Sequence, residues 1–151
     1  MKLFDNLFNK ARTKEYTNDD VVAPVSGTMI SPGKIQDSVF SKEMLGQTIG
    51  IEPTDNIIVS PVNGTIETLF STGHAFGVKT AEGNGFLVHI GIDTVSMRGQ
   101  GFKTFAKQGD TVKAGQKIVS VNLEKVSEMG HMKTVMLILT EKGKKIIKWI
   151  T

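Results

Sequence analysis

The sequence predicts an all-β fold, an antiparallel sandwich or barrel with short helices. From Val21 onward, short runs rich in Val, Ile, Thr and Phe alternate with Gly, Pro, Asn and Asp about every ten residues. The segments VVAPVSGTMI (21–30) and IVSPVNGTIE (58–67) share five residues at matching places, which indicates a duplicated strand–turn–strand unit. No helical periodicity is long enough for the crossover helices of a parallel sheet.

The strands are expected in segments rich in β-branched or aromatic residues and bounded by turn residues. In chain order these segments are VVAPVSGTMI (21–30), QTIGIE (47–52), NIIVS (56–60), NGTIETLF (63–70), AFGVKT (75–80), GFLVHIG (85–91), TVK (111–113), KIVSV (117–121) and TVMLILT (134–140). Two further segments lie between turn residues without this pattern, and we expect them to be short helices at 41–45 and 123–129.

Composition limits the classes of protein. The chain has 151 residues, 39% of them hydrophobic, which is enough for one compact domain. The net charge is +3, and much of the excess lies in KGKKIIK (142–148) without interleaved aromatic residues, so nucleic-acid binding is not expected. There is no cysteine, which excludes disulfides, thiolate chemistry and Cys-type zinc sites. No apolar run approaches about 20 residues and no signal-peptide pattern opens the chain, so we expect a cytoplasmic, free-standing protein.

Residues 1–20 differ in composition from the domain expected over 21–151. Their apolar residues recur at helical spacing, which predicts a short amphipathic helix. These are Leu3, Phe4, Leu7, Phe8 and Ala11. Two interpretations stand for this tail: peripheral contact with a membrane surface through residues 1–14, or packing of its apolar face on its own domain.

One strand carries a histidine in an apolar run. A period of two assigns its residues to two faces. One face has Phe86, Val88, Ile90 and Ile92, and the other has Leu87, His89, Gly91 and Asp93. The first face can be core, while the glycine beside His89 leaves room for a molecule to approach it. A lone histidine here would most simply be structural, with a hydrogen bond to a backbone carbonyl.

A second histidine, His74, follows a glycine in STGHAFGVKT (71–80) and has Thr72 nearby. Alternation puts it on one side with Phe76 and Val78. Two adjacent imidazoles suit either of two chemistries. They can be half of a zinc site, or a pair in which one ring nitrogen attacks phosphorus while the other ring donates to the phosphoryl oxygens. Sequence spacing leaves open whether the two rings meet.

The segments FSTGHAFGVKT and GFLVHIGIDTVSMRGQGF resemble the two histidine motifs of the glucose-type enzyme IIA domain of the bacterial sugar phosphotransferase system. The likeness extends through VVAPVSGTM, DSVFSKEMLG, SPVNGTI and KQGDTVKAGQKIV, over residues 21–128. It implies an antiparallel β-sandwich of the barrel-sandwich (duplicated hybrid motif) type. It also implies a phosphorelay without a cofactor. The carrier HPr delivers a phosphoryl group to this domain, and a IIB domain passes it to sugar entering through a membrane channel.

On this resemblance His89 matches the phosphoacceptor, His74 the supporting histidine, and Thr72 a hydroxyl that bonds to His74. The attacking nitrogen must be unprotonated, as imidazole largely is near neutral pH. The other nitrogen must hold the proton, and we expect a backbone carbonyl near Gly91 to bind it. The resemblance also implies an apolar docking surface with acidic residues at its rim, suited to a basic carrier. The apolar positions are Val39, Phe40, Met44, Leu45, Phe70, Phe76, Leu87 and Val95, and the acidic ones are Asp37 and Asp93.

The C-terminus departs from the family pattern. After TVMLILT the chain reads EKGKKIIKWIT, where the family runs through a further turn into a closing strand. The segment IIKWI can form a strand, but we expect one or two edge strands to be missing. An uncovered sheet edge invites pairing with another chain.

Other functions compete with the relay. A carrier modified on lysine, like biotinyl or lipoyl modules, would share the turn in QGDTVKAGQKIV and use Lys125, but Asn-Leu-Glu (122–124) replaces the Glu-Ala-Met of such sites. A zinc hydrolase would need a third ligand, and no His-x-His occurs. His131 is expected at the surface. The alternative that stays open is a regulatory or zinc-binding protein on the same fold, with accessory zinc at His74 and His89.

Overall fold

The computed structural model describes residues 15–143 and 148–149, so the tail helix expected within residues 1–14 lies outside the described residues. The strands are β1 Asp20–Val21, β2 Gly27–Ile30, β3 Gln47–Pro53, β4 Ile57–Val59, β5 Gly64–Leu69, β6 Ala75–Lys79, β7 Gly85–Ile90, β8 Phe102–Thr104, β9 Thr111–Val112, β10 Lys117–Val121, β11 Val135–Glu141 and β12 Lys148–Trp149. The helices are α2 Ser38–Ser41 and α3 Leu123–Glu128, with 3-10 turns at Pro32–Lys34 and Thr94–Met97. None of the described helices is long and apolar enough to cross a membrane.

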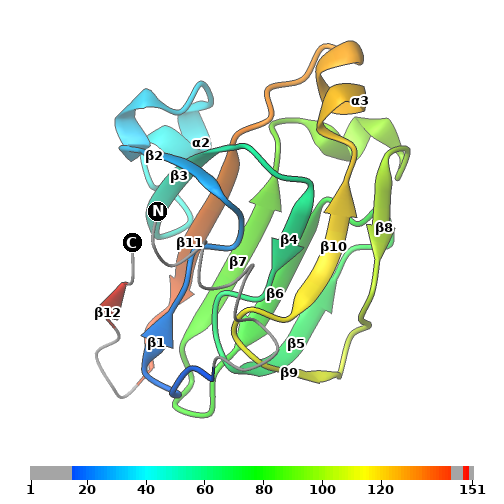
Figure 1. Cartoon of the computed structure of the whole chain (residues 1–151). Coiled ribbons are helices and arrows are strands. Elements are labelled where there is room, and N and C mark those ends of the chain that lie inside the picture. The colour runs from blue at the N-terminus through cyan, green and yellow to red at the C-terminus, as the bar shows by residue number, and fades with distance from the viewer. Residues whose placement is uncertain (1–14, 144–147, 150–151) are drawn as a thin grey trace.

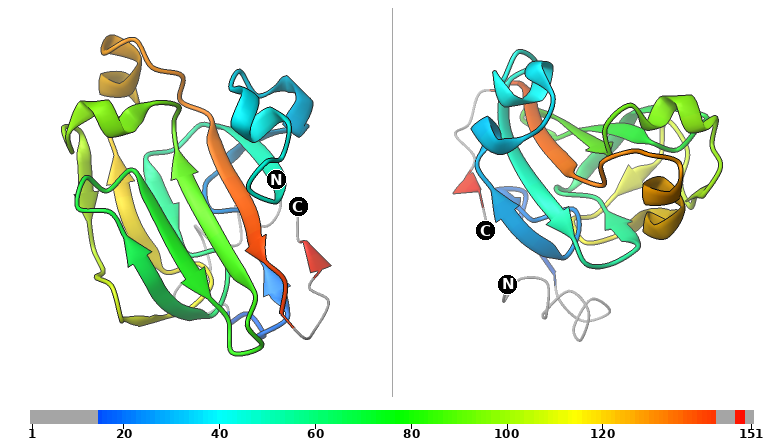
Figure 2. Two further views of the ribbon diagram at one scale, coloured as in Figure 1. Left: turned by 180° about the vertical axis from the view of Figure 1, so that it is seen from behind. Right: turned by 90° about the horizontal axis from the view of Figure 1, so that it is seen from above.

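The strands form two facing layers, as Figure 1 shows. One layer is a seven-stranded sheet in the order β2-β3-β11-β7-β6-β5-β9, and the other is a three-stranded sheet in the order β4-β10-β8. Every neighbouring pair in these two sheets is antiparallel. The left view of Figure 2 looks onto the outer face of the larger sheet, away from the smaller one. The predicted antiparallel β-sandwich is therefore confirmed.

The duplicated segments meet in space. The backbone N–H of Val22 donates to the carbonyl of Pro61, and that of Val59 donates to the carbonyl of Pro24, both at 2.8 Å. Val22 and Val59 occupy matching places in the two copies, as do the two prolines, so these bonds are reciprocal. Each copy uses the carbonyl of a proline, which has no N–H to offer in return. The reciprocity supports the interpretation of a duplicated unit.

The core lies between the layers and follows the predicted alternation along β7. Phe86, Val88 and Ile90 are fully buried in the large cluster between the sheets, whereas Leu87 and His89 are half-buried on the opposite face. Ile92, expected with the first group, instead packs in a smaller cluster on the outer face of the sheet. The alternation fails there because the strand ends at Ile90 and a turn follows.

The structure differs from the prediction at three elements. Segment 21–30 is two strands, since β1 ends at Val21 and β2 begins at Gly27, with the proline turn between them. The helix expected at 41–45 lies earlier, as α2, because the carboxylate of Asp37 accepts hydrogen bonds from the N–H groups of Val39 and Phe40 and so starts the helix there. Strand β8 was not predicted, since Phe-Lys-Thr is too short to show alternation.

The C-terminal segment does supply a strand. β12 pairs with β1 in parallel, with Lys148 opposite Asp20 and Trp149 opposite Val21. Figure 1 shows β12 beside β1 at the edge of the molecule. Lys148 and Trp149 therefore form a strand, as the IIKWI segment suggested, but this strand pairs with β1 and not with an edge strand of either larger sheet. The division into a tail at 1–20 and a domain at 21–151 stays a prediction.

Candidate functional site

The two histidines meet at the ends of neighbouring strands. His89 lies on β7, opposite Ala75 of β6 and Met136 of β11. His74 immediately precedes β6, after a turn in which Gly73 has φ +76°, and its carbonyl accepts a 2.7 Å hydrogen bond from the N–H of Ile90. The two ring centroids are 5.3 Å apart with an interplanar angle of 80°. Simple alternation grouped His74 with the core side chains Phe76 and Val78; its ring instead contacts a histidine on the other face of the sheet.

The ring of His89 has one nitrogen fixed by the backbone. Its Nδ1 is 2.8 Å from the carbonyl oxygen of Gly91. A carbonyl only accepts hydrogen bonds, so Nδ1 carries the proton and Nε2 carries the lone pair. Gly91 has φ +77°, and a Cβ atom there would lie 2.5 Å from Cγ2 of Thr94. The chain therefore needs glycine at this position, and that glycine directs its carbonyl to His89.

His74 is held in a similar way. Its Nδ1 is 2.6 Å from the hydroxyl oxygen of Thr72. When this hydroxyl donates to Nδ1, the ring proton resides on Nε2, where it can be donated to a neighbouring oxygen atom. Aromatic rings flank both histidines: Phe70 is 5.1 Å from His74 and Phe40 is 5.0 Å from His89, centroid to centroid. Each ring is therefore held in orientation by a hydrogen bond at its Nδ1 and by a neighbouring aromatic ring.

Both histidines are neutral near pH 7. Burial, and then the neighbouring His89, lower the pKa of His74 from 6.5 to about 4. Burial also lowers the pKa of His89, and three effects oppose it: the hydrogen bond from Nδ1 to Gly91 and the charges of Asp37 and Asp93. A neutral imidazole keeps its lone pair, so the site holds a ring nitrogen that can act as a nucleophile without prior loss of a proton.

Most of the residues expected on the docking surface lie at the surface of the molecule. Val39, Met44, Leu45, Phe70 and Val95 are all exposed, Met44 most of all at 67%. Leu87 is half-buried beside His89, and Phe40 is largely buried with its ring against His89. Phe76 is an exception and corrects our expectation. It is fully buried in the core because it pairs with Val88, on the face of the sheet turned away from His89.

The acidic residues have different settings. Asp37 caps α2 and is half-buried, while Asp93 is exposed in a left-handed conformation with φ 60°. Both are close enough to His89 to raise its pKa, so they place negative charge at the rim of the site. His131, expected at the surface, is half-buried, and its Nε2 lies 3.2 Å from the hydroxyl of Ser96.

The geometry gives little support to the two competing functions, a zinc site and a lysine-modified carrier. Within residues 15–143 and 148–149, no three His, Asp or Glu side chains gather as a metal site would require, so a zinc ion at His74 and His89 would have two protein ligands from this part of the chain. Lys125 lies inside helix α3, so the turn that resembles lysine-modified carriers does not present this lysine at its tip.

Comparisons with known proteins agree with the site. Residues 19–145 match the family described as phosphoenolpyruvate-dependent sugar phosphotransferase system, EIIA 1. The glucose-specific EIIA component of Mycoplasma capricolum is 40% identical over 131 residues, covering 87% of this chain and 85% of that protein. The Bacillus cereus counterpart is 37% identical over 139 residues, covering 91% and 82%. The solved glucose permease IIA from M. capricolum has a TM-score of 0.78 at 40% identity, covering 88% of each chain.

A β-sandwich of this type, with these relatives, defines the class of protein as a phosphotransferase component that transfers phosphoryl groups through histidine. The chain belongs to the EIIA 1 family of the phosphoenolpyruvate-dependent sugar phosphotransferase system. Its role is that of a phosphocarrier in sugar uptake. Membership of this family implies interaction with HPr and with the IIB domain of a sugar permease.

Proposed function

We propose that His89 is the phosphoryl carrier, which accepts its phosphoryl group from phospho-HPr and gives it to a IIB domain. The observation that supports this most directly is the 2.8 Å hydrogen bond from Nδ1 of His89 to the carbonyl of Gly91. This bond leaves Nε2 unprotonated, and the ring is only half-buried, so a partner can approach it.

The transfer is a displacement at phosphorus. The lone pair of His89 Nε2 attacks the phosphorus atom carried by HPr, and an N–P bond forms while the donor's N–P bond breaks. The donor imidazole leaves with the electron pair of the broken bond. His89 keeps its proton on Nδ1 throughout, held by Gly91. In the second transfer a nucleophile of the IIB domain attacks the same phosphorus atom, and the N–P bond to His89 breaks. The electron pair of that bond stays on Nε2, so His89 is again a neutral imidazole.

His74 assists the second step of the relay. With Thr72 donating to its Nδ1, its Nε2–H can donate a hydrogen bond to an oxygen of a phosphoryl group on His89. Negative charge on the phosphoryl oxygens shifts during transfer, and a fixed donor that follows this shift lowers the barrier. A single neutral donor binds the phosphoryl group only moderately, which suits a carrier that must release it.

The surface around the pair suits the proposed partners. The exposed ring of Phe70 lies against His74, and Asp37 and Asp93 place negative charge near His89, as a basic carrier surface would require. We place this exchange in the cytoplasm, where HPr and the IIB domain operate. The relatives are named glucose-specific, so glucose is the first sugar to test, although the membrane component selects the sugar.

The test is phosphorylation in a reconstituted relay. The protein is incubated with phosphoenolpyruvate, enzyme I and HPr, and intact and fragment masses are measured at neutral to alkaline pH, where phosphohistidine survives. We expect one phosphate on His89, none on His89→Gln, and full acceptance by the matched control His131→Gln. Normal acceptance by a folded His89→Gln variant would overturn the assignment.

A further inference from the structure

The carbonyl of Gly91 determines which nitrogen of His89 is free, so the contacts that hold this carbonyl bear on the relay. Gly91 has φ +77°, and glycine adopts many backbone conformations, so its own backbone does not fix the direction of its carbonyl. Strand β7 ends one residue earlier, at Ile90. The orientation of His89 therefore depends on contacts made around this turn.

The peptide unit before Gly91 is held at both of its polar groups. Its carbonyl, that of Ile90, accepts a 2.5 Å hydrogen bond from the hydroxyl of Thr94, which is fully buried. Its N–H, that of Gly91, donates to the carbonyl of Thr134 at 2.8 Å. A peptide unit is planar, so two bonds in this arrangement oppose its rotation. They also oppose any turn of Gly91 that would take its carbonyl away from His89.

The peptide unit after Gly91 is held by the same neighbouring segment. Its N–H, that of Ile92, donates to the carbonyl of Met132 at 3.0 Å. Residues 131–134 thus accept hydrogen bonds from both sides of Gly91. This segment is neither helix nor strand, and Thr134 is its one buried residue. Anchoring Thr134 therefore anchors the two carbonyls that hold the turn.

Glu52 provides this anchor. The buried hydroxyl of Thr134 donates to Oε1 of Glu52 at 2.5 Å, across 82 residues of chain. Glu52 lies on β3, and Val135, the residue after Thr134, pairs with Ile51 of the same strand. A hydrogen bond to a carboxylate is stronger than one between two neutral groups. The bond thus fastens the irregular segment to a strand of the larger sheet.

We infer that Thr94, Thr134 and Glu52 are positioning residues for the nucleophile of the relay. Each acts through the backbone at Gly91, Glu52 by holding Thr134. Together they direct the carbonyl of Gly91 to Nδ1 of His89, which keeps the lone pair on Nε2 available for attack. None of the three side chains needs to touch the phosphoryl group. The inference rests on the proposed role of His89 as phosphoryl carrier.

The tautomer of His89 is the direct readout, because it reports the Gly91 carbonyl and not the overall stability of the fold. While this bond holds, one ring nitrogen carries the proton, and the two ring nitrogen signals in NMR lie far apart. In a released ring the tautomers interconvert, and the two signals move toward each other. We expect this movement in Thr94→Val and in Thr134→Val, which lack the hydroxyl donors.

The same variants should slow the chemistry. Phosphoramidate is a small phosphoryl donor that needs no docking surface, so acceptance from it measures the nucleophile alone. We expect Thr94→Val and Thr134→Val to accept phosphate from phosphoramidate about tenfold more slowly than wild type, because each loses one hydrogen bond that orients the reacting ring.

Conservative variants should behave as wild type. Thr94→Ser keeps the hydroxyl, and Glu52→Gln keeps an oxygen that can accept from Thr134, so both should retain the tautomer and a rate within about twofold. Glu52→Leu has no acceptor and should slow acceptance about three- to tenfold. Because Glu52 is only half-buried, Glu52→Leu also serves if Thr134→Val does not fold.

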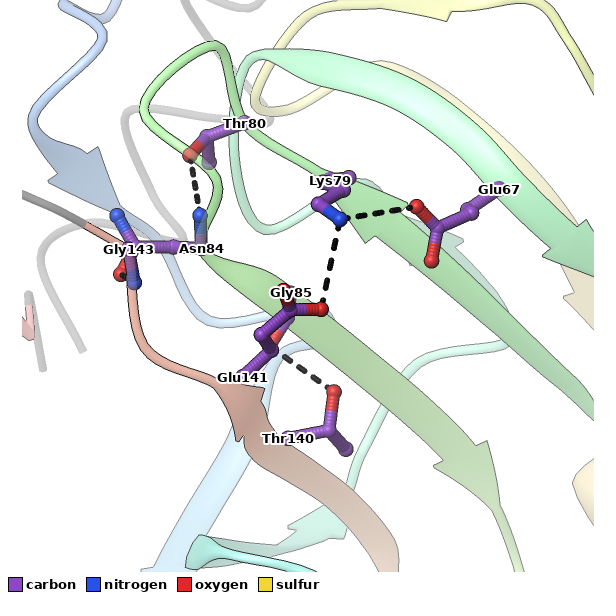
Figure 3. Close-up of polar contacts among 8 residues, drawn as sticks. All are labelled: Glu67, Lys79, Thr80, Asn84, Gly85, Thr140, Glu141 and Gly143. Atoms are coloured by element: carbon purple, nitrogen blue, oxygen red, sulfur yellow. Dashed lines mark hydrogen bonds and ion pairs between the residues drawn. The ribbon is translucent and has the colours of Figure 1, made fainter.

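Thr80→Val is the matched control. Thr80 is also buried, and its hydroxyl accepts a hydrogen bond from the N–H of Asn84, next to the start of β7 and at the opposite end of that strand from His89, as Figure 3 shows for the Thr80 contact. This variant loses a hydrogen bond between a buried hydroxyl and the backbone. It should therefore lose stability but keep the His89 tautomer and the rate.

Wild-type signals and rates in folded Thr94→Val and Glu52→Leu would overturn the inference, as would slower acceptance with unchanged signals. Equal losses in Thr80→Val would also overturn it, since they would reflect stability alone. Each of these results leaves the relay itself intact. If the wild-type protein accepted phosphate from neither phospho-HPr nor phosphoramidate, the proposed function would fail, and this inference with it.

Discussion

The ring of His74 lies edge-on to the ring of His89, 5.3 Å away between centroids, and each ring has its Nδ1 in a hydrogen bond. The two bonds differ in kind. The carbonyl of Gly91 can only accept, which fixes the proton of His89 on Nδ1, whereas the hydroxyl of Thr72 can donate to His74. Two chemically identical side chains thereby have different roles, one as nucleophile and one as hydrogen-bond donor.

His74→Gln should separate acceptance from onward transfer. The variant keeps the nucleophilic Nε2 of His89, so we expect acceptance from phospho-HPr to stay within a few-fold of wild type. Transfer to the IIB domain should slow about 100- to 1,000-fold, the usual effect of removing one donor to a developing negative charge. Rapid-quench measurement of each half-reaction checks this. Equal slowing of both would mean that His74 acts mainly in acceptance or in folding.

Thr72→Val should affect the same step less strongly. Valine has nearly the shape of threonine but cannot donate to Nδ1 of His74, so the ring proton is no longer held on Nε2. Loss of one hydrogen bond of this kind corresponds to about tenfold at most. We expect slower transfer to the IIB domain with unchanged acceptance. The double variant with His74→Gln should be no slower than His74→Gln alone, and an additive loss would show that Thr72 acts independently.

His74 should make stability depend on pH. Its pKa is about 4 in the folded protein and 6.5 in the unfolded chain, so the unfolded chain binds a proton first as the pH falls. The free energy of unfolding should therefore be highest above pH 6.5 and decrease by roughly 1–3 kcal/mol as the pH falls to about 4. Urea unfolding of wild type and His74→Gln at several pH values measures this. The variant should show a smaller decrease, and identical pH dependence would contradict the assignment.

Gly91→Ala should disturb His89 through the backbone. An alanine at φ +77° is strained, and its Cβ would lie 2.5 Å from Thr94 and 3.0 Å from the carbonyl of Met132. We expect a loss of at least about 1–2 kcal/mol in the free energy of unfolding. Relief of the clash would also move the carbonyl that orients His89, so acceptance from phosphoramidate should slow. Gly109→Ala, also at positive φ but with open space around it, is the control for strain alone.

Two phenylalanines should respond in opposite ways to truncation. Phe76 is fully buried, so Phe76→Ala should lower the free energy of unfolding by about 3–5 kcal/mol. Phe70 is 45% exposed beside His74, so Phe70→Ala should change stability little but raise KM for phospho-HPr. Thermal unfolding and transfer kinetics on the same samples distinguish them. A large increase in KM for folded Phe76→Ala would show that Phe76 does belong to the docking surface.

Several features followed from local sequence pattern. The period of two along β7 correctly assigned Phe86 and Val88 to the core and His89 to the other face, because side-chain direction in a strand depends only on position along it. Asp37 also carried a readable signal. A capping residue there marks the start of α2 at Ser38, earlier than the helix expected at 41–45.

Other features depended on how distant segments pack. The register that sets Ala75 against His89 brings the histidines together, and no local pattern encodes a pairing between strands. The same register makes Phe76 core, contrary to its expected place on the docking surface, and leaves Gly77 half-buried on the opposite face. By itself the sequence determined most of the strands, the two faces of β7 and the histidine motifs, because these depend on neighbouring residues. Only the tertiary structure decided the contact of His74 with His89 and the hydrogen bond of Thr134 with Glu52, because both arise from the pairing of separate strands.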